Sequence, residues 1–261
     1  MAITQGRTII TGATGGIGSA FANHLAAQGY NLLLMCKYQH LLDLQAQKLQ
    51  EKFSIKIDTI AGDLADKDKV DCIVKEIKQL EHIDYLINCA GYSENKQFSE
   101  ENIDAVLQMI EVHVCSTVKF VHAVLPGMMK RKRGTIITVS SLAAFLPAPG
   151  SSIYSATKSF LNSFMESIHM EVHEYGIKVQ SLCPGLTHTN FHARSQSNID
   201  TPCIDLWMEA DEVVRHSFHD LEDGNVISVP GFVNKSVKNT VPVLPRKFYY
   251  KLAEKIKTGN H

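Results

Sequence analysis

The sequence lacks several features that would place it in a specialised class of protein. Six of its 261 residues are cysteines, at positions 36, 72, 89, 115, 183 and 203, and no C-x-x-C pair occurs among them. Scattered cysteines in apolar segments are typical of buried, reduced thiols rather than of a disulfide framework. No charged-then-apolar leader begins the chain and no apolar run approaches 18 residues, so we expect a cytoplasmic protein without a membrane span.

The chain also lacks an excess of charge of either sign. It has 26 lysines and arginines against 27 aspartates and glutamates, a formal net charge of −1. Nucleic acid and anionic membranes are therefore not expected as its main partners. The one basic run, KRKRG from Lys130, is typical of a solvated carboxyl end of a helix, where positive charge is favoured.

Short apolar segments alternate with longer amphipathic ones along the chain. Strands are predicted at 7–11, 31–36, 55–60, 83–89, 134–140, 177–183 and 225–229, and helices at 16–28, 39–53, 66–80, 101–132 with a break near 114, 152–175 and 210–222. Strands that are apolar throughout are buried on both faces of a parallel sheet. Regular β–α alternation gives right-handed crossovers. The predicted fold is α/β: one Rossmann domain over 1–261, with a doubly wound, seven-stranded parallel sheet and helices on both faces.

A glycine-rich turn joins the first predicted strand to the first helix. The stretch TGATGGIG places Gly12, Gly16 and Gly18 where a tight turn, a nearby phosphate and helix-on-strand packing leave no room for a Cβ. Anionic phosphates would then lie at the positive amino end of the helix. A nucleoside triphosphatase loop is not indicated, because no lysine follows the last glycine. Taken alone, the pattern also fits a βα turn that binds nothing.

A tyrosine and a lysine stand four residues apart in SSIYSATKSF, residues 151–160. This spacing puts Tyr154 and Lys158 on one face of the predicted helix. A free tyrosine has a pKa of about 10, and a nearby cation lowers it. A drop of ~3 units corresponds to about 4 kcal/mol of differential stabilisation. We therefore expect Tyr154 to transfer a proton to a carbonyl oxygen; the alternative is an ordinary exposed helix pair.

These two motifs and four others resemble, in order, the short-chain dehydrogenase/reductase family over nearly the whole chain. They are TGATGGIG (11–18), DL (63–64), NCAG (88–91), SS (140–141), YSATK (154–158) and PGLTHT (184–189). The resemblance implies that Ser141 hydrogen-bonds the substrate oxygen and that Lys158 also holds the cofactor ribose. It implies a nicotinamide cofactor bound by Gly12, Thr14, Gly15, Gly16, Ile17, Gly18, Cys36, Lys37, Asp63, Leu64, Asn88, Ala90, Gly91, Tyr154, Lys158, Pro184, Gly185, Thr187 and Thr189.

One position departs from the family. Where the family has an asparagine that holds a water between the lysine and solvent, the stretch EVHVCST has His113. A histidine can also accept and donate hydrogen bonds, and it titrates near neutrality. Two interpretations remain open: His113 takes over this catalytic role, or it only packs a break between two helices.

The stretch LLLMCKYQH after the second predicted strand bears on the cofactor. In the family, the acid that accepts the ribose hydroxyls of NAD(H) falls at the position of Cys36. In family members that bind NADP(H), a cation that pairs with the 2′-phosphate stands one place later, at the position of Lys37. This chain has no acid and one cation there, so NADP(H) is favoured over NAD(H), unless Lys37 is simply a surface residue.

The last segments bear on the substrate. Residues 186–209, the family's substrate lid, contain Phe191, Ile204, Leu206, Trp207 and Met208 and favour a hydrophobic ketone or 3-oxoacyl-type substrate. The histidine pairs 188/192 and 169/173 lack a third ligand, so no metal is expected. The extension 231–261 has prolines and then a helix with a stripe of Phe248, Leu252 and Ile256. It resembles the tail of very-long-chain 3-oxoacyl reductases and their bacterial relatives. A membrane-surface helix and packing on the domain or lid are both open.

Together these features predict an NADPH-dependent reductase of a carbonyl compound, reversible as an alcohol dehydrogenase. Its catalytic residues are Ser141, Tyr154, Lys158 and His113, and its partner is a small carbonyl or alcohol substrate. The resemblance also implies a homodimer or homotetramer. One alternative is a catalytically idle dinucleotide-binding regulator, which need not keep serine, tyrosine and lysine together. The other, a nucleotide-sugar epimerase or dehydratase, usually has a G-x-x-G-x-x-G turn and a longer substrate domain.

Overall fold

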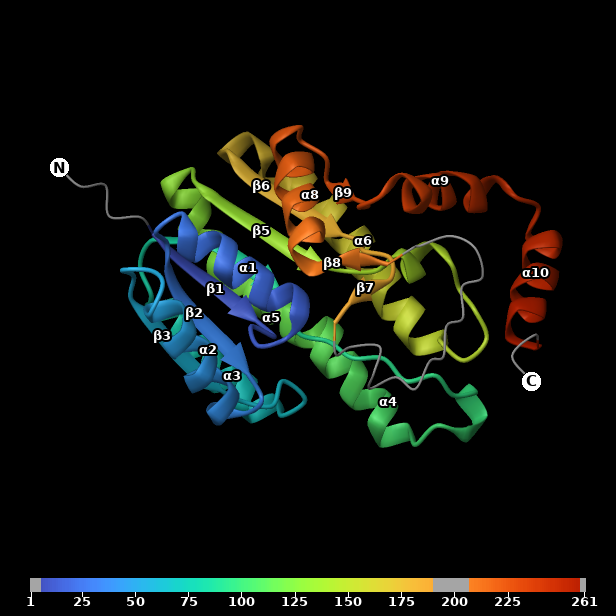
Figure 1. Ribbon diagram of the computed structural model, residues 1–261, viewed down its shortest axis with the longest axis horizontal. Coiled ribbons are helices and arrows are strands. Elements are labelled where there is room, and N and C mark those ends of the chain that lie inside the picture. Colours follow the sequence, from blue (N-terminus) through green and yellow to red (C-terminus); the bar gives the residue numbers. More distant parts are fainter. Residues whose placement is uncertain (1–5, 190–206, 259–261) are drawn as a thin grey trace.

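The chain forms a single Rossmann-type α/β domain built on a parallel sheet (Figure 1). The computed structural model describes residues 6–189 and 207–258. The sheet has seven strands in the order β3-β2-β1-β4-β5-β6-β9. Their bounds are β1 Arg7–Thr11, β2 Asn31–Cys36, β3 Ile57–Ala61, β4 Ile83–Asn88, β5 Gly134–Val139, β6 Ile177–Leu182 and β9 Ile227–Ser228. The predicted fold class is confirmed, and the strand bounds agree with it to within two residues.

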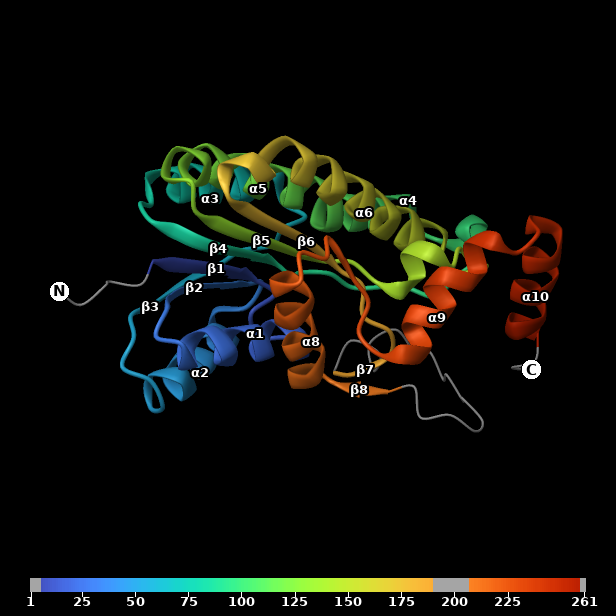
Figure 2. The ribbon, with the colours of Figure 1, turned by 90° about the horizontal axis from the view of Figure 1, so that it is seen from above.

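Helices cover both faces of the sheet, as Figure 2 shows from above. On one face lie α1 (Gly16–Ala27), α2 (Gln39–Gln50) and α8 (Ala210–Glu222); on the other lie α3 (Lys67–Gln79), α4 (Ile103–Ile110), α5 (Ser116–Arg131) and α6 (Ser152–Val172). Successive side chains of a strand point to opposite faces, so Ile10 packs in one core cluster with Phe21 and Ile9 packs in the other with Phe120. Each fully buried side chain of this size contributes ~1.5–3 kcal/mol. This two-sided burial explains why the strands are apolar throughout.

The predicted break near residue 114 is a π-helical turn, Glu111–Cys115, between α4 and α5. By length and composition, Ile103–Arg131 is a candidate membrane span within the described residues, which the sequence analysis did not anticipate. Its side chains Phe120, Val121 and Val124, however, are buried in one core cluster with residues of the sheet and of α3. This is the environment of a core helix.

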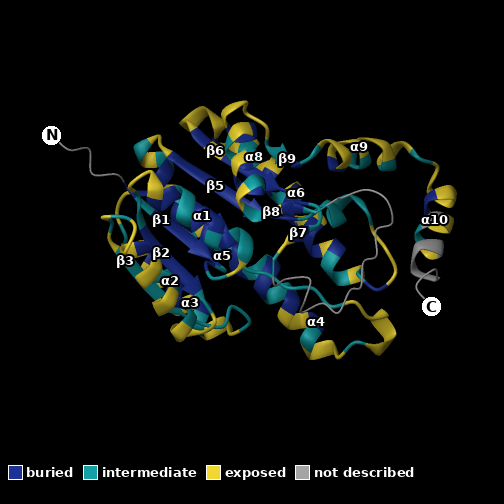
Figure 3. Ribbon diagram, viewed as in Figure 1, coloured by how far each residue is buried: buried dark blue, intermediate teal, exposed yellow. Residues whose placement is uncertain are grey.

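The C-terminal extension leaves the sheet as α9 (Phe232–Thr240), passes through a 3₁₀ turn at Val241–Val243, and ends in α10 (Arg246–Thr258) (Figure 1). Most of α9 and α10 is exposed in Figure 3. The predicted stripe is wrong at its first member, because Phe248 is exposed and its neighbour Tyr249 is buried instead. The Tyr249 hydroxyl donates a hydrogen bond to the Pro147 carbonyl at 2.9 Å. The side chains of Leu252 and Ile256 lie outside the described residues.

Two smaller expectations also need correction. Of the five described cysteines, all free thiols, Cys183 is buried and Cys72 is exposed, so burial of the thiols is not general; Cys203 lies outside the described residues. The basic run is more than a solvated helix end. Arg131 donates to the Ile83 carbonyl, and Arg133 pairs with Asp84 at 2.8 Å, which fastens the end of α5 to the start of β4.

Candidate active site

A cleft of about 690 Å³ opens beyond the carboxyl ends of the central strands. The strand order reverses between β1 and β4, and ligands of open α/β sheets bind at such a switch point. The walls of this cleft contain every predicted cofactor and catalytic residue except Asn88 and His113. Those two side chains are buried. The structure therefore brings together motifs that are up to 178 positions apart, from Thr11 to Thr189, around one cavity.

The turn between β1 and α1 forms a cradle that side chains would fill. Gly12 has a φ of +65°, and a Cβ there would lie 2.9 Å from the Ala90 backbone. A Cβ on Gly16 would meet the Thr189 side chain, and one on Gly18 would meet the Gly12 carbonyl. No side chain caps the amino end of α1, so its free N–H groups are suited to anionic phosphates. These residues fit a dinucleotide.

The NCAG turn after β4 is fixed from behind. The Thr11 hydroxyl accepts hydrogen bonds from the backbone N–H groups of Cys89 and Ala90, at 3.0 and 3.1 Å. Asn88, predicted to contact the cofactor, is buried and donates to the Thr138 hydroxyl at 3.2 Å. Asn88 thus joins β4 to β5 below the cleft wall that Ala90 and Gly91 form.

Lys37 and Asp63, predicted separately as cofactor-binding residues, form an ion pair in the wall of the cleft. Lys37 Nζ lies 2.6 Å from Asp63 Oδ2. The hydrogen bond to Asp63 raises the pKa of Lys37. Partial burial acts to raise the pKa of Asp63, but hydrogen bonds from Lys37 and from the Ala65 N–H lower it overall. Both groups are charged at neutral pH.

Three of the four residues predicted to be catalytic, Ser141, Tyr154 and Lys158, meet where β5 ends and α6 begins. Ser141 follows β5, and its hydroxyl accepts from the Ala143 N–H at 3.1 Å. Tyr154 and Lys158 lie on consecutive turns of α6. Lys158 Nζ lies 5.6 Å from the centroid of the Tyr154 ring and donates to the Val139 carbonyl at 2.8 Å.

The protonation of this group differs from the prediction. Burial raises the pKa of Tyr154 to about 12, and a hydrogen bond with Ser141 opposes that shift. Burial lowers the pKa of Lys158 to about 8. Lys158 was expected to lower the pKa of Tyr154, but burial of the phenol raises it instead. At neutral pH Tyr154 therefore carries its proton, while Lys158 is mainly a cation.

His113 is 1% exposed and has both ring nitrogens engaged. Nε2 accepts from the Tyr92 N–H at 3.1 Å, and Nδ1 lies 3.0 Å from the Thr157 hydroxyl oxygen. Burial, and then the charge of Lys158, hold the pKa of His113 well below its usual value. The expectation that His113 titrates near neutrality is therefore wrong. Neither Thr157 nor Tyr92 was predicted to take part, because YSATK assigns a role only to its tyrosine and lysine and Tyr92 lies outside the motifs.

Only part of the predicted substrate lid is described. His188 stacks on Trp207 with ring centroids 5.0 Å apart. β7 (Thr187–His188) pairs with β8 (Met208–Glu209), and Met208 belongs to the hydrophobic core. Phe191, His192, Ile204 and Leu206 lie outside the described residues. Trp207 is therefore the described aromatic residue of this segment.

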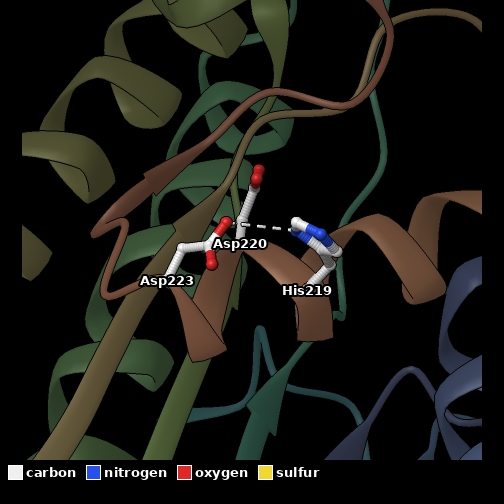
Figure 4. Close-up of side chains that lie close together, drawn as sticks. All are labelled: His219, Asp220 and Asp223. Atoms are coloured by element: carbon white, nitrogen blue, oxygen red, sulfur yellow. Dashed lines mark ion pairs between the residues drawn. The ribbon is translucent and has the colours of Figure 1, made fainter.

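His169 and His173 stack loosely on each other, 5.4 Å apart, and a separate cluster brings metal-binding side chains together. Figure 4 shows the ion pair of His219 with Asp223, with Asp220 pointing away from it. The carboxylate of Asp220 accepts from the Ser228 hydroxyl at 2.7 Å and lies 3.6 Å from Lys235 Nζ. Protein partners thus already engage these groups, and the cluster joins α8 to β9 and α9.

Comparison with known proteins identifies the family. A family model described as short chain dehydrogenase matches residues 7–200. The chain belongs to this family. The short-chain dehydrogenase is 32% identical to the very-long-chain 3-oxoacyl-CoA reductase of Mus musculus over 249 residues, which cover 94% of this chain and 77% of the mouse protein.

Two further comparisons are informative. The chain is 31% identical over 189 residues to inactive hydroxysteroid dehydrogenase-like protein 1 of Homo sapiens, covering 72% of this chain and 57% of that protein. A solved structure of a short-chain dehydrogenase from Sphingobium yanoikuyae in complex with NADPH has the same fold, with a TM-score of 0.81 at 23% identity, covering 92% of this chain and 97% of that one. The short-chain dehydrogenase is thus an oxidoreductase of carbonyl and hydroxyl groups that uses a nicotinamide dinucleotide.

Proposed function

We propose that this short-chain dehydrogenase is an NADPH-dependent reductase of hydrophobic ketones, with a 3-oxoacyl thioester as the preferred class. The observation that carries the proposal is the meeting of Ser141, Tyr154 and Lys158 at one end of the cleft, with the phenol protonated. The likeness to a 3-oxoacyl-CoA reductase over 94% of the chain supports the acyl substrate. A cytoplasmic location and a homodimer or homotetramer remain predictions.

Each of the three side chains has a distinct task. The bound dinucleotide supplies the hydride to the substrate carbonyl carbon. Tyr154 donates its phenolic proton to the carbonyl oxygen as that oxygen gains negative charge. Ser141, which hydrogen-bonds Tyr154, orients the same oxygen. The buried ammonium of Lys158 lies 5.6 Å from the Tyr154 ring and stabilises the phenolate that is left behind.

The protonation states favour the reductive direction. A general acid must begin the reaction with its proton, and a pKa of about 12 keeps that proton on Tyr154 throughout the physiological range. Oxidation of an alcohol would instead need the phenolate, which burial disfavours here. Reduction is therefore the direction that Tyr154 is prepared for at neutral pH.

The preference for NADPH rests on Cys36 and Lys37. An acid at position 36 would repel a 2′-phosphate, and this chain has a thiol there. Lys37 stands at the mouth of the same end of the cleft, paired with Asp63. A 2′-phosphate would compete with that carboxylate for the ammonium, so Lys37 provides a moderate rather than an absolute preference.

The rival proposal is a catalytically idle dinucleotide-binding protein, which the likeness to a relative named inactive keeps open. Against it stands the complete set of Ser141, Tyr154 and Lys158 around one cleft. A protein that only binds a dinucleotide has no need of a proton donor beside the cavity.

The experiment that separates these proposals is NADPH consumption by the full chain against simple ketones, β-keto esters and 3-oxoacyl thioesters of increasing length, with NADH as the matched control. We expect turnover with NADPH, rising with the length of the acyl chain, and slower turnover with NADH. Binding of NADPH without turnover on any of these compounds would favour the idle protein.

A further inference from the structure

The side chain of His113 bridges two walls of the cleft from behind. It projects from the π-helical turn Glu111–Cys115 and lies between the segment after β4, where Tyr92 begins a loop, and the first turns of α6. A Cβ on Gly91 would lie 3.0 Å from His113 Nε2 and 3.6 Å from Lys158 Nζ. The ring also meets the ring of Tyr154 edge-on, with centroids 5.9 Å apart. His113 therefore contacts both the loop after β4, through Tyr92, and α6, through Thr157 and Tyr154.

The partners of the ring determine where its proton is. The backbone N–H of Tyr92 can only donate, so Nε2 must accept and carries no proton. In the neutral ring the proton is then on Nδ1, which donates to the Thr157 hydroxyl oxygen at 3.0 Å. Thr157 in turn uses its one hydroxyl proton to donate to the Tyr154 carbonyl at 2.8 Å. The result is a chain in which every donor faces an acceptor.

We propose that His113 is a positioning residue, held as the neutral Nδ1–H tautomer, that ties the Gly91–Tyr92 wall to the turn of α6 carrying Tyr154 and Lys158. It is not a proton relay, because both ring nitrogens are already bonded to protein groups and neither is left for a water. The family's asparagine holds a water, whereas His113 in this chain accepts a hydrogen bond from the backbone N–H of Tyr92.

The reason for histidine at this position is reach. The two ring nitrogens lie on different sides of the ring, so one side chain can accept from Tyr92 and donate to Thr157 at once. The amide group of an asparagine lies about as far from the backbone as Nδ1 and would not reach the N–H of Tyr92. The amide group of a glutamine lies about as far from the backbone as Nε2 and would reach it. A π-helical turn places an extra residue in the helix, and such turns are frequent at functional sites.

Burial and the charge of Lys158 oppose protonation of the ring. Lys158 and the phenol of Tyr154 face it from α6, and the phenol of Tyr92 faces it from the loop after β4. A proton on Nε2 would point at the N–H of Tyr92 and add a second cation beside Lys158. Protonation would therefore break the hydrogen bond between Tyr92 and His113, and it would also cost the free energy of burying a charge.

The direct test is the tautomer of His113 in the full chain with NADPH present, read from ring ¹⁵N and ¹³C chemical shifts. The 12 histidines give overlapping signals, so the signal of His113 is identified as the one lost in His113→Gln. We expect an Nδ1–H ring, opposite to the preference of free histidine, that does not titrate between about pH 5 and 8. An Nε2–H ring, or a titration inside that window, would overturn the proposal.

The kinetic test uses two matched sets of variants, two at Thr157 and three at His113. Thr157→Val leaves the Nδ1–H without its acceptor, and kcat is expected to fall by ~10- to 100-fold through misplacement of Tyr154, while the Kd for NADPH is retained. Thr157→Ser keeps the hydroxyl and should recover most of that loss. His113→Gln keeps the acceptor for Tyr92 and His113→Asn keeps the donor for Thr157, so each is expected to lose less than His113→Leu, which keeps neither.

The two tests fail differently. The expected fall in kcat rests on the proposed function, because Tyr154 is the proton donor only within it. The expected tautomer of His113 does not rest on that function. If the wild type consumes no NADPH with any substrate, the proposed function fails and the ring signals still decide the state of His113. If the wild type is active and Thr157→Val, Thr157→Ser and His113→Leu all match its kcat, His113 is only a packing residue.

Discussion

The wall behind Tyr154 and the C-terminal arm, residues 231–258, are stabilised in opposite ways. Behind Tyr154, the side chains of His113, Thr157 and Lys158 are each at most 5% exposed and bond to one another or to backbone groups. On the arm, Phe232 is 86% exposed and Phe248 is 58% exposed. A buried bond left unmade costs ~1–3 kcal/mol, so the wall has one arrangement. The arm has fewer buried polar contacts of this kind, at Asn234 and Tyr249.

Charge separates the two regions as well. The arm and the last residues after it contain seven of the 26 lysines and arginines but only one of the 27 acids. The first part of the arm packs against the loop after β6 that borders the cleft. Asn234 is buried, donates to the Pro230 carbonyl at 2.8 Å, and occupies the space that a Cβ on Gly185 would need. The described part of α10 is held to the domain through Tyr249 and Pro147.

The largest effect should come from the wall. Tyr154→Phe removes the proton donor and keeps the ring that packs against His113. We expect kcat to fall by ~10²–10⁴-fold, with the Kd for NADPH and the melting temperature little changed. Steady-state kinetics beside a fluorescence titration with NADPH measures both. Wild-type turnover in this variant would remove Tyr154 from the mechanism.

A smaller effect is expected at the adenosine end of the cleft. Cys36→Asp places a carboxylate near the site of the 2′-phosphate and should weaken NADPH about tenfold or more through like-charge repulsion, so that NAD(H) becomes preferred. Thermal shifts with NADPH and NADH compare the two, since a ligand at ~100 times its Kd adds about 2.7 kcal/mol. Cys36→Ser, which adds no charge, serves as control. Equal shifts for both cofactors in the wild type would contradict the NADPH preference.

Lys158 predicts how the enzyme responds to pH. Its pKa is lowered to about 8, so the ammonium is present below that pH and is lost above it. Turnover should therefore decline as pH rises through about 8, and Tyr154, with a pKa of about 12, should not contribute to that limb. No acid limb near pH 6.5 is expected, because the pKa of His113 lies well below that value. A profile of kcat/KM between pH 5 and 10 measures both limbs; one that is flat through pH 9 would show that Lys158 acts without its charge.

The smallest effect on chemistry is expected from the end of the arm. Removal of residues 245–261 leaves all seven strands in place and should spare the Kd for NADPH while changing KM for the longer acyl substrates. Tyr249→Phe, which removes only the bond to Pro147, should cost ~0.5–1.5 kcal/mol of stability. If the truncated chain loses NADPH binding and substrate binding together, the arm is part of the folded core and the contrast between the two regions fails.

Local pattern by itself determined the seven strands of the sheet, the helices that cover it and the glycine turn, but it did not indicate α9 or the short strands β7 and β8. Apolar runs and amphipathic periodicity depend on residues that are near one another in the chain, which is why the element bounds could be predicted closely. The family motifs also predicted a large part of the cleft wall, but not such lining residues as Tyr38, Tyr92 and Gln108, which lie outside those motifs.

Tertiary structure decided the chemical state of those residues. Lys158 was expected to lower the pKa of Tyr154, but burial of the phenol where α6 packs on the domain raises it. Thr157 is a spacer in the sequence and a hydrogen-bond partner in the fold, because only packing brings it to the π-helical turn that carries His113. Burial and the distance between groups far apart in the chain control pKa and tautomer, and neither quantity is present in a local pattern of residues.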